Sequence, residues 1–191
     1  MNLIYEDFPA SIFVDDEEIP IVTDFREYVK LIDILEDTDL SPYEKRFLVD
    51  QFFIKGPPEN FEGAMDALAE FVTMEALRRP GQESGEEHEG EEKEKDVYSF
   101  EIDYPFIFSA FLHDYGINIR TVPYLHWWEF RMLFDGLSDD TEIKQRIMYR
   151  SIDLKDVKDK DERRRIEKIQ RSIKLPDDAL TDYDIGDAFE W

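Results

Sequence analysis

The spacing of apolar positions predicts helices along most of the chain. In the first predicted helix the apolar residues follow the i, i+3, i+4, i+7 pattern of an amphipathic helix. These residues are Phe25, Tyr28, Val29, Ile32 and Leu35. Thr23 and Asp24 stand just before them and offer side-chain oxygens to the first backbone N–H groups. We therefore expect one amphipathic helix that ends near Asp37.

Local start and stop signals bound two further helices in the N-terminal half. Ser41 offers a cap hydroxyl, a proline follows at the first helical position, and Glu44 is placed to return the hydrogen bond. This predicts a helix over residues 42 to about 54. Asn60 is a candidate cap for a third helix over 61–79, which a Pro-Gly pair then stops.

The C-terminal half opens with two more helical patterns. Asp103 precedes a helical row of apolar residues that runs to Gly116, a glycine placed like a C-cap. Pro123 opens the next helix, which contains YLHWWEFRMLFDGL (124–137), and Gly136 lies near its end. We expect both segments to belong to the folded core.

Two final helices and one hairpin complete the prediction. Asp139 or Asp140 is the candidate cap of a short helix, and a basic helix follows over Val157 to Ile173. Near the N-terminus, SIFV and EIPIV flank DDE at 15–17, which is typical of a short β-hairpin. The sequence thus predicts a mainly α fold: a compact helical domain of about six or seven helices with a short N-terminal β-hairpin.

The distribution of charge divides the chain into parts. The net charge is −24, and half of it lies in two segments without helical or strand periodicity. Residues 83–96 hold eight acids and two lysines, and 176–191 hold six acids and no base. Blocks of like charge repel one another and are typical of disorder. We expect an N-terminal part over 1–79, an acidic linker over 80–97, a helical part over 98–175 packed on the first, and an acidic tail over 176–191.

Composition excludes several classes of function. Strong acidity argues against general nucleic-acid binding and against binding to an anionic membrane surface. No run approaches the roughly 18 apolar residues of a membrane span, and the N-terminus lacks a signal-peptide pattern. The absence of cysteine excludes disulfides, thiolate metal sites and cysteine nucleophiles. We expect an intracellular protein without nucleic-acid or membrane partners.

The aromatic stretch at 124–137 raises the question of a binding site. At 100° per residue its apolar side chains divide into two arcs. The narrow arc holds Leu125, Trp128 and Met132, and the broad arc holds Trp127, Phe130, Leu133, Phe134 and Leu137. A helix with two apolar faces is either clamped between two layers or keeps one face for a partner. The partner-binding hypothesis names Trp127, Trp128, Phe130 and Phe134.

Candidate chemistry is sparse. His126 lies among these aromatics, but none of the three histidines has a ligand companion at metal-binding spacing. Pairs of acids are expected by chance among 47 acidic residues. No phosphate loop, nucleophile elbow or calcium loop appears. We expect no enzyme activity, no catalytic residues, no metal site and no cofactor.

The basic helix and the acidic tail are the remaining candidate surfaces. The helix carries an apolar row of isoleucines at 166, 169 and 173, which fits a solvated helix docked by one face. A functional interpretation makes its outer bases a surface for an acidic partner, including the chain's own tails. The residues in question are Arg163, Arg164, Arg165, Lys168 and Arg171. The tail TDYDIGDAFEW alternates acids with large apolar residues, which fits either plain disorder or a docking peptide.

The arrangement of these segments resembles a known family. PIVTDFREYVKLIDIL, AFLHDYGINI and LHWWEFRMLFDGLSDDTEIKQRIMYRSIDLKDVKDKDERRRIEKIQ are similar to the bacteriophage gene-product-fifteen family of siphophage tail proteins. The resemblance covers most of residues 1–175. Its most specific parts are LHWWEF and the downstream pair Tyr149 and Arg150.

The resemblance implies a role in tail assembly without known catalytic residues. Members are encoded between the major tail protein and the tape-measure protein, the position of tail-assembly chaperones. Such chaperones bind the apolar, largely helical tape measure in the host cytoplasm and help to recruit tail-tube subunits. Two alternatives remain open: an acidic DNA mimic that inhibits a host nucleic-acid-binding protein, and a structural tail component retained in the virion.

Overall fold

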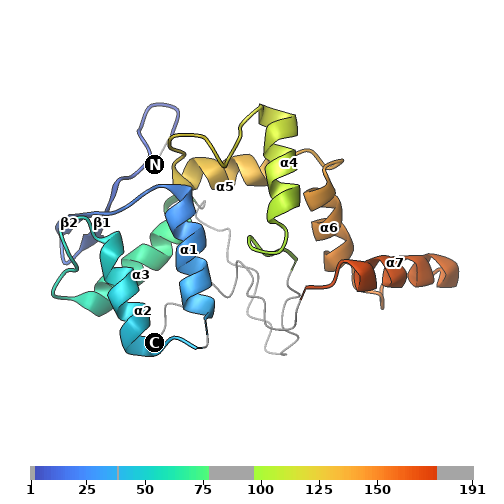
Figure 1. Cartoon of the computed structure of the whole chain (residues 1–191), viewed down its shortest axis with the longest axis horizontal. Helices are drawn as coiled ribbons and strands as arrows, with labels where there is room; N and C mark the ends of the chain where they lie inside the picture. The colour runs from blue at the N-terminus through green and yellow to red at the C-terminus, as the bar shows by residue number, and fades with distance from the viewer. Residues whose placement is uncertain (1–2, 38, 78–96, 176–191) are drawn as a thin grey trace. The chain divides into compact units, whose positions relative to one another are not determined.

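The computed structural model describes residues 3–37, 39–77 and 97–175, and these residues form a mainly helical protein (Figure 1). Within them lie one two-stranded hairpin, two short 3-10 helices and seven α-helices, so the predicted fold class is confirmed. In chain order the elements are β1 (Ser11–Val14), β2 (Glu17–Pro20), α1 (Phe25–Glu36), α2 (Pro42–Val49), η1 (Asp50–Phe52), α3 (Phe61–Val72), η2 (Glu75–Leu77), α4 (Tyr104–Tyr115), α5 (Trp127–Asp135), α6 (Glu142–Ser151) and α7 (Lys160–Ser172).

The described residues fall into two compact units. The first unit comprises 3–37, 39–77 and 124–131, and the second comprises 97–123 and 132–175. The first turns of α5 therefore belong to the first unit and its last turn to the second. The acidic linker and tail predicted from the sequence lie outside the described residues, except for Val97.

The two units differ sharply in charge. The described residues of the first unit hold 20 acidic and 6 basic side chains, which gives −14. Those of the second unit hold 13 of each and are neutral. The acidity of the folded part is therefore concentrated in one unit, a division that the total charge of the chain conceals.

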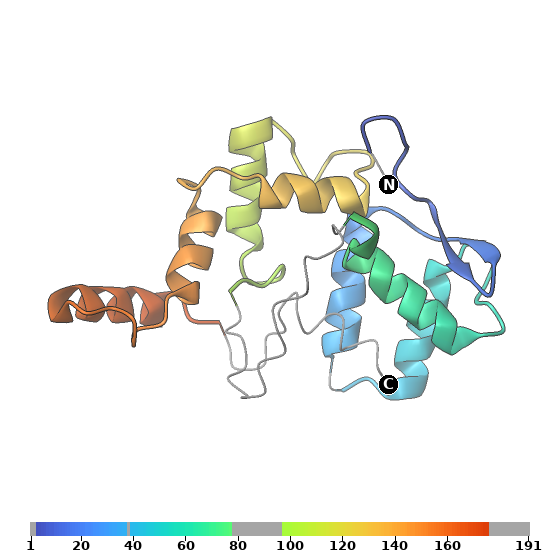
Figure 2. The ribbon, with the colours of Figure 1, turned by 180° about the vertical axis from the view of Figure 1, so that it is seen from behind.

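The N-terminal hairpin closes through a two-residue turn. Asp15 and Asp16 adopt positive φ angles of 51° and 64° between the paired residues Val14 and Glu17. Such angles at both turn positions match the twist of the flanking strands, and aspartate tolerates them. The opposed pair formed by Ile12 and Ile19 is buried. Both views show the hairpin beside α3 (Figures 1 and 2).

In the first unit the helices begin where the sequence predicts, but two of them end earlier than predicted. Ser41 and Glu44 form the predicted capping box of α2. However, α2 ends at Val49 rather than near residue 54, and the chain continues only as the 3-10 turn η1 to Phe52, after which Phe53 turns extended and bridges Ile21 beside the hairpin. Likewise α3 ends at Val72 rather than 79, and tertiary partners bind its last carbonyl groups.

In the second unit α4 ends at the glycine that the sequence predicts. Gly116 adopts φ 66°, in the left-handed region that glycine enters without steric cost, and its N–H binds carbonyl groups of the last turn. Both views show α7 extending away from the foot of α6 (Figures 1 and 2). Asp159 caps α7 by accepting from two backbone N–H groups. This helix begins at Lys160, three residues later than predicted.

Two other predicted starts in the C-terminal half are wrong. Helix α5 begins at Trp127 rather than just after Pro123, because Leu125 and Trp127 make backbone hydrogen bonds to Phe25 and Thr23. This pairing holds the chain extended until the helix begins. Helix α6 follows Thr141 rather than Asp139 or Asp140.

Candidate functional site

The two adjacent tryptophans of α5 form hydrogen bonds with the C-terminal end of α3. The Trp127 indole N–H donates to the Val72 carbonyl at 3.0 Å, and that of Trp128 donates to the Phe71 carbonyl at 2.8 Å. Carbonyl groups in the last turn of a helix have no partner within the helix. The Val72 and Phe71 carbonyl groups thus each accept from an indole, Phe71 in addition to the Met74 backbone N–H, while the two indole rings fill the core.

Aromatic packing completes this cluster within the first unit. Tyr28 lies on Trp127 with ring centroids 5.3 Å apart, and Phe25 stacks on Phe130 at 4.5 Å. Tyr28 is fully buried, and its hydroxyl donates to the Val22 carbonyl. Burial raises the pKa of Tyr28, so its hydroxyl remains a donor at neutral pH.

These contacts decide between the two interpretations of the aromatic stretch. Trp127, Trp128, Phe130 and Phe134 are at most 2% exposed, and of the narrow arc Met132 is exposed. In the second unit, Phe134 packs against Tyr98 and Phe100. The four aromatics named for partner binding are therefore core residues. Their periodicity was compatible with an open face, but the indole hydrogen bonds require contact with α3.

His126 is held in one tautomer at the N-terminus of α5. The Trp128 backbone N–H donates to Nδ1 at 3.0 Å, so the ring proton is on Nε2, which donates to the Pro9 carbonyl at 2.9 Å. Phe8 stacks on the ring. Both ring nitrogens have partners, which is the arrangement of a structural histidine.

His126 predicts a defined pH dependence of stability. Burial lowers the pKa of its imidazole in the folded protein. As pH falls, His126 is therefore protonated in the unfolded chain, near pH 6.5, before it is protonated in the folded protein. Stability is therefore lost as pH falls below about 6.5. We expect the stability advantage of the natural protein over a His126→Asn variant to shrink between pH 7 and pH 5 in urea titrations. Asparagine can still cap the helix, and His113 is common to both proteins; a difference that does not change with pH would contradict this account.

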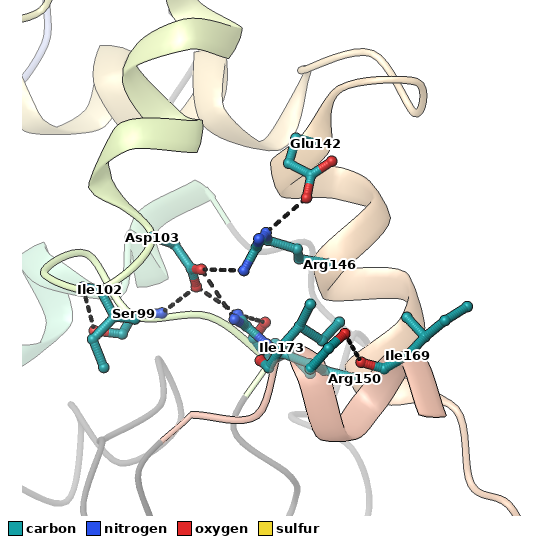
Figure 3. A network of polar contacts seen from close by, with 10 residues as sticks. Ser99, Ile102, Asp103, Glu142, Arg146, Arg150, Ile169 and Ile173 are labelled. Carbon is teal, nitrogen blue, oxygen red and sulfur yellow. Dashed lines mark hydrogen bonds and ion pairs between the residues drawn. The ribbon is translucent and has the colours of Figure 1, made fainter. Parts of the chain in front are cut away.

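Arg150 organises the second unit through a buried ion pair (Figure 3). Its guanidinium binds both carboxylate oxygens of Asp103, at 2.5 and 3.0 Å. It also donates to the carbonyl groups of Val97 and Ile173. Asp103 is 0% exposed and Arg150 6%. One side chain of α6 thus joins the start of α4, the end of α7 and the segment before α4.

The Asp103 carboxylate is surrounded by hydrogen-bond and ion-pair partners. The Ser99 N–H donates to its carboxylate at 3.2 Å, and Arg146 lies 3.9 Å away. Arg146 is itself bound to Glu142 and lies over the Phe106 ring (Figure 3 shows the polar contacts). A buried carboxylate whose oxygens are bound by this many donors has the arrangement of a structural ion pair. Sequence reasoning placed Asp103 before a helix but missed this pairing across 47 residues.

The bases named for partner binding on α7 are exposed. Arg163, Arg164, Lys168 and Arg171 all lie at the surface. Arg164 forms an exposed ion pair with Asp161 at 3.6 Å, and Arg171 pairs with Glu167. The Arg163 side chain instead donates to the Val157 carbonyl. These side chains therefore lie open to a partner at the surface.

An exposed aromatic pair on α2 is a candidate that sequence reasoning missed. Tyr43 and Phe47 are 80% and 62% exposed, and residues four apart lie side by side on a helix. The opposite side of α2 is anchored by buried Val49 and by Lys45, which donates to the Leu35 carbonyl. Large exposed apolar side chains with a polar rim are typical of interaction sites. The i, i+4 spacing of the two rings was the available signal.

Two further apolar side chains are exposed on the small ribbon of the first unit. Phe13 on β1 is 67% exposed and Ile54 is 64% exposed. Phe13 lies between the buried residues Ile12 and Val14 on β1, so alternation along the strand points it to the opposite face. The first unit therefore combines high acidity with exposed aromatic rings. We call the surface formed by Tyr43 and Phe47 the α2 aromatic face.

The described residues hold no group of three or more histidine, cysteine or acidic side chains placed for a metal ion. None of the helices described here is both long and apolar enough to span a membrane.

Comparison with known proteins gives one match. No curated protein and no solved structure matched the chain. The family model described as Bacteriophage Gp15 protein matches residues 4–175, a stretch that includes Trp127, Trp128 and Arg150. Because this match covers nearly the whole sequence, the chain belongs to the Bacteriophage Gp15 protein family.

Proposed function

We propose that this chain is a non-enzymatic tail-assembly protein that binds the tape-measure protein during tail morphogenesis. Membership of a phage family supports a role in the viral cycle. The observation that carries the proposal is the α2 aromatic face, where two large rings are exposed on a unit of charge −14. An apolar surface on an acidic carrier suits a partner that is itself apolar.

The geometry of the face favours a helical partner. Tyr43 and Phe47 stand one turn apart and present about 6 Å of apolar ridge along the helix axis. An amphipathic partner helix meets such a ridge with residues at i, i+3 or i+4, and i+7. The surrounding acids keep the loaded carrier apart from other copies by charge repulsion. On this account the chain holds a tape-measure helix until tail-tube subunits replace it.

The proposal predicts that the two rings supply much of the binding energy. We expect Tyr43→Ser/Phe47→Ser to weaken capture of the co-expressed tape-measure protein by at least about 10-fold, because large aromatics are common hot spots. Their exposure means that the variant keeps its fold, which circular dichroism checks. The matched control is Leu112→Ser/Met148→Ser, which removes two exposed apolar side chains of the second unit. A tape measure equally soluble with and without this chain would end the proposal.

The charge of the first unit favours a second candidate, an acidic protein that occupies a nucleic-acid-binding host protein. Twenty acids in one folded unit provide the fixed carboxylates that imitation of a phosphate backbone requires. This candidate predicts binding to a host protein that DNA displaces. Retention as a structural tail component is a third role, and mass spectrometry of purified virions separates it from a transient assembly factor.

A further inference from the structure

We propose that the acidic C-terminal segment of this chain, residues 176–191, docks on the outward face of α7. This face is defined by Arg164, Lys168 and Arg171 and is called the α7 basic row. The inference concerns a contact of the chain with itself and is independent of the tape-measure proposal.

The orientation of α7 fixes which side chains face outward. Ile166 is 7% exposed, and Ile169 and Ile173 are half-buried on the same side. Gln170 donates to the carbonyl groups of Tyr149 and Ile152, both at 2.8 Å, and anchors that side to the end of α6. At 100° per residue the α7 basic row lies on the opposite side. Its members follow the i, i+4, i+7 spacing and therefore form one line along the helix.

The row carries a positive surplus in an acidic protein. In the part of the chain that the structure describes, Arg164 pairs with Asp161 and Arg171 pairs with Glu167, and both ion pairs are exposed. Along α7 as a whole there are six bases and three acids. Over 142–175 the count is twelve to seven. Exposed ion pairs are weak and exchange readily, so a denser acidic segment can replace them.

The C-terminal segment has the composition and the attachment to fill this role. It holds six acids and no base, and it begins directly after Leu175, three residues beyond the end of α7. Helix α7 has 13 residues and is therefore about 20 Å long. A chain of 16 residues spans up to roughly 50 Å when extended, enough to turn back along the helix. Attachment also gives the segment an effective concentration in the millimolar range.

Trp191 provides a direct readout in the full chain. Trp127 and Trp128 are at most 2% exposed, so acrylamide quenching of tryptophan fluorescence reports mainly on Trp191. We expect the quenching constant to rise about 2-fold between roughly 50 and 500 mM NaCl, because salt screens the contact. A Trp191→Phe variant measures the background from the two core residues.

Charge reversal on the row identifies the docking surface. Arg164→Glu/Lys168→Glu/Arg171→Glu should raise quenching at low salt to the high-salt value. The matched control is Lys30→Glu/Lys55→Glu/Arg120→Glu, which changes the net charge equally at exposed positions outside α7 and should leave quenching unchanged. Circular dichroism checks that both variants fold.

Several results would overturn the proposal. Salt-independent quenching in the natural sequence excludes an electrostatic contact. Equal quenching in the α7 variant and the natural protein at low salt places the segment elsewhere. Protection of Trp191 that grows with protein concentration would assign the contact to a second copy of the chain instead.

Discussion

An Arg150→Met variant is expected to lose about 3–5 kcal/mol of unfolding free energy, the usual effect of removing one partner from a buried ion pair. Methionine fills a similar volume but leaves the fully buried Asp103 carboxylate without its bidentate donor. It also leaves the carbonyl groups of Val97 and Ile173 without that partner. Urea denaturation followed by far-ultraviolet circular dichroism measures the loss.

Two controls separate charge from geometry at this position. Arg150→Lys keeps the charge but not the planar fork of donors, so we expect an intermediate loss. Arg146→Gln should cost less than Arg150→Met, because Arg146 is 3.9 Å from Asp103 and its side chain is 19% exposed. An Arg150→Met protein within about 1 kcal/mol of the natural stability would show that the ion pair contributes little net energy.

The second large effect is expected at Trp127. Trp127→Ala should cost about 3–5 kcal/mol, because it leaves a cavity where a fully buried ring packed against Tyr28 and Phe130. Trp127→Phe keeps an aromatic ring but removes the donor to Val72 and part of the indole, so we expect a smaller loss of about 1–3 kcal/mol. Denaturant titration followed by circular dichroism tests both, since tryptophan fluorescence changes with the substitution itself.

The same substitutions test the link between α5 and α3. If the indole donors hold the last turn of α3, amide hydrogen exchange there should accelerate in Trp127→Phe and in Trp128→Phe. Tyr43→Phe is the matched control, because Tyr43 is 80% exposed and surface changes usually stay within about 0.5 kcal/mol. Unchanged exchange in both tryptophan variants would assign the end of α3 to its own sequence instead.

The residues that carry the family resemblance have structural roles in the core. The most specific motif parts are LHWWEF and the pair containing Arg150, and both reach carbonyl groups far away in the sequence. Such residues identify a fold because few other side chains place donors there. They do not identify a partner, and the candidate binding residues Tyr43 and Phe47 lie outside both motifs. The residues that carry the family resemblance and the residues proposed for partner binding are therefore different.

The amino-acid sequence by itself determined the local features of this protein. The Ser41 and Glu44 capping box, the Gly116 helix end, the N-terminal hairpin and the apolar row of α1 all depend on neighbours within a few residues. Interactions over such short spans leave a readable pattern of caps and periodicity. The mainly helical class followed from them.

Only the tertiary structure decided which aromatic surfaces are closed and which are open. Two apolar arcs on α5 fit either a clamped helix or a free face, and the choice depended on carbonyl groups of α3 more than 50 residues away. The same held for Asp103 with Arg150, for the early ends of α2 and α3, and for the exposure of Tyr43 and Phe47. Periodicity records which side of a helix is apolar, but burial depends on whether another part of the chain arrives to cover it.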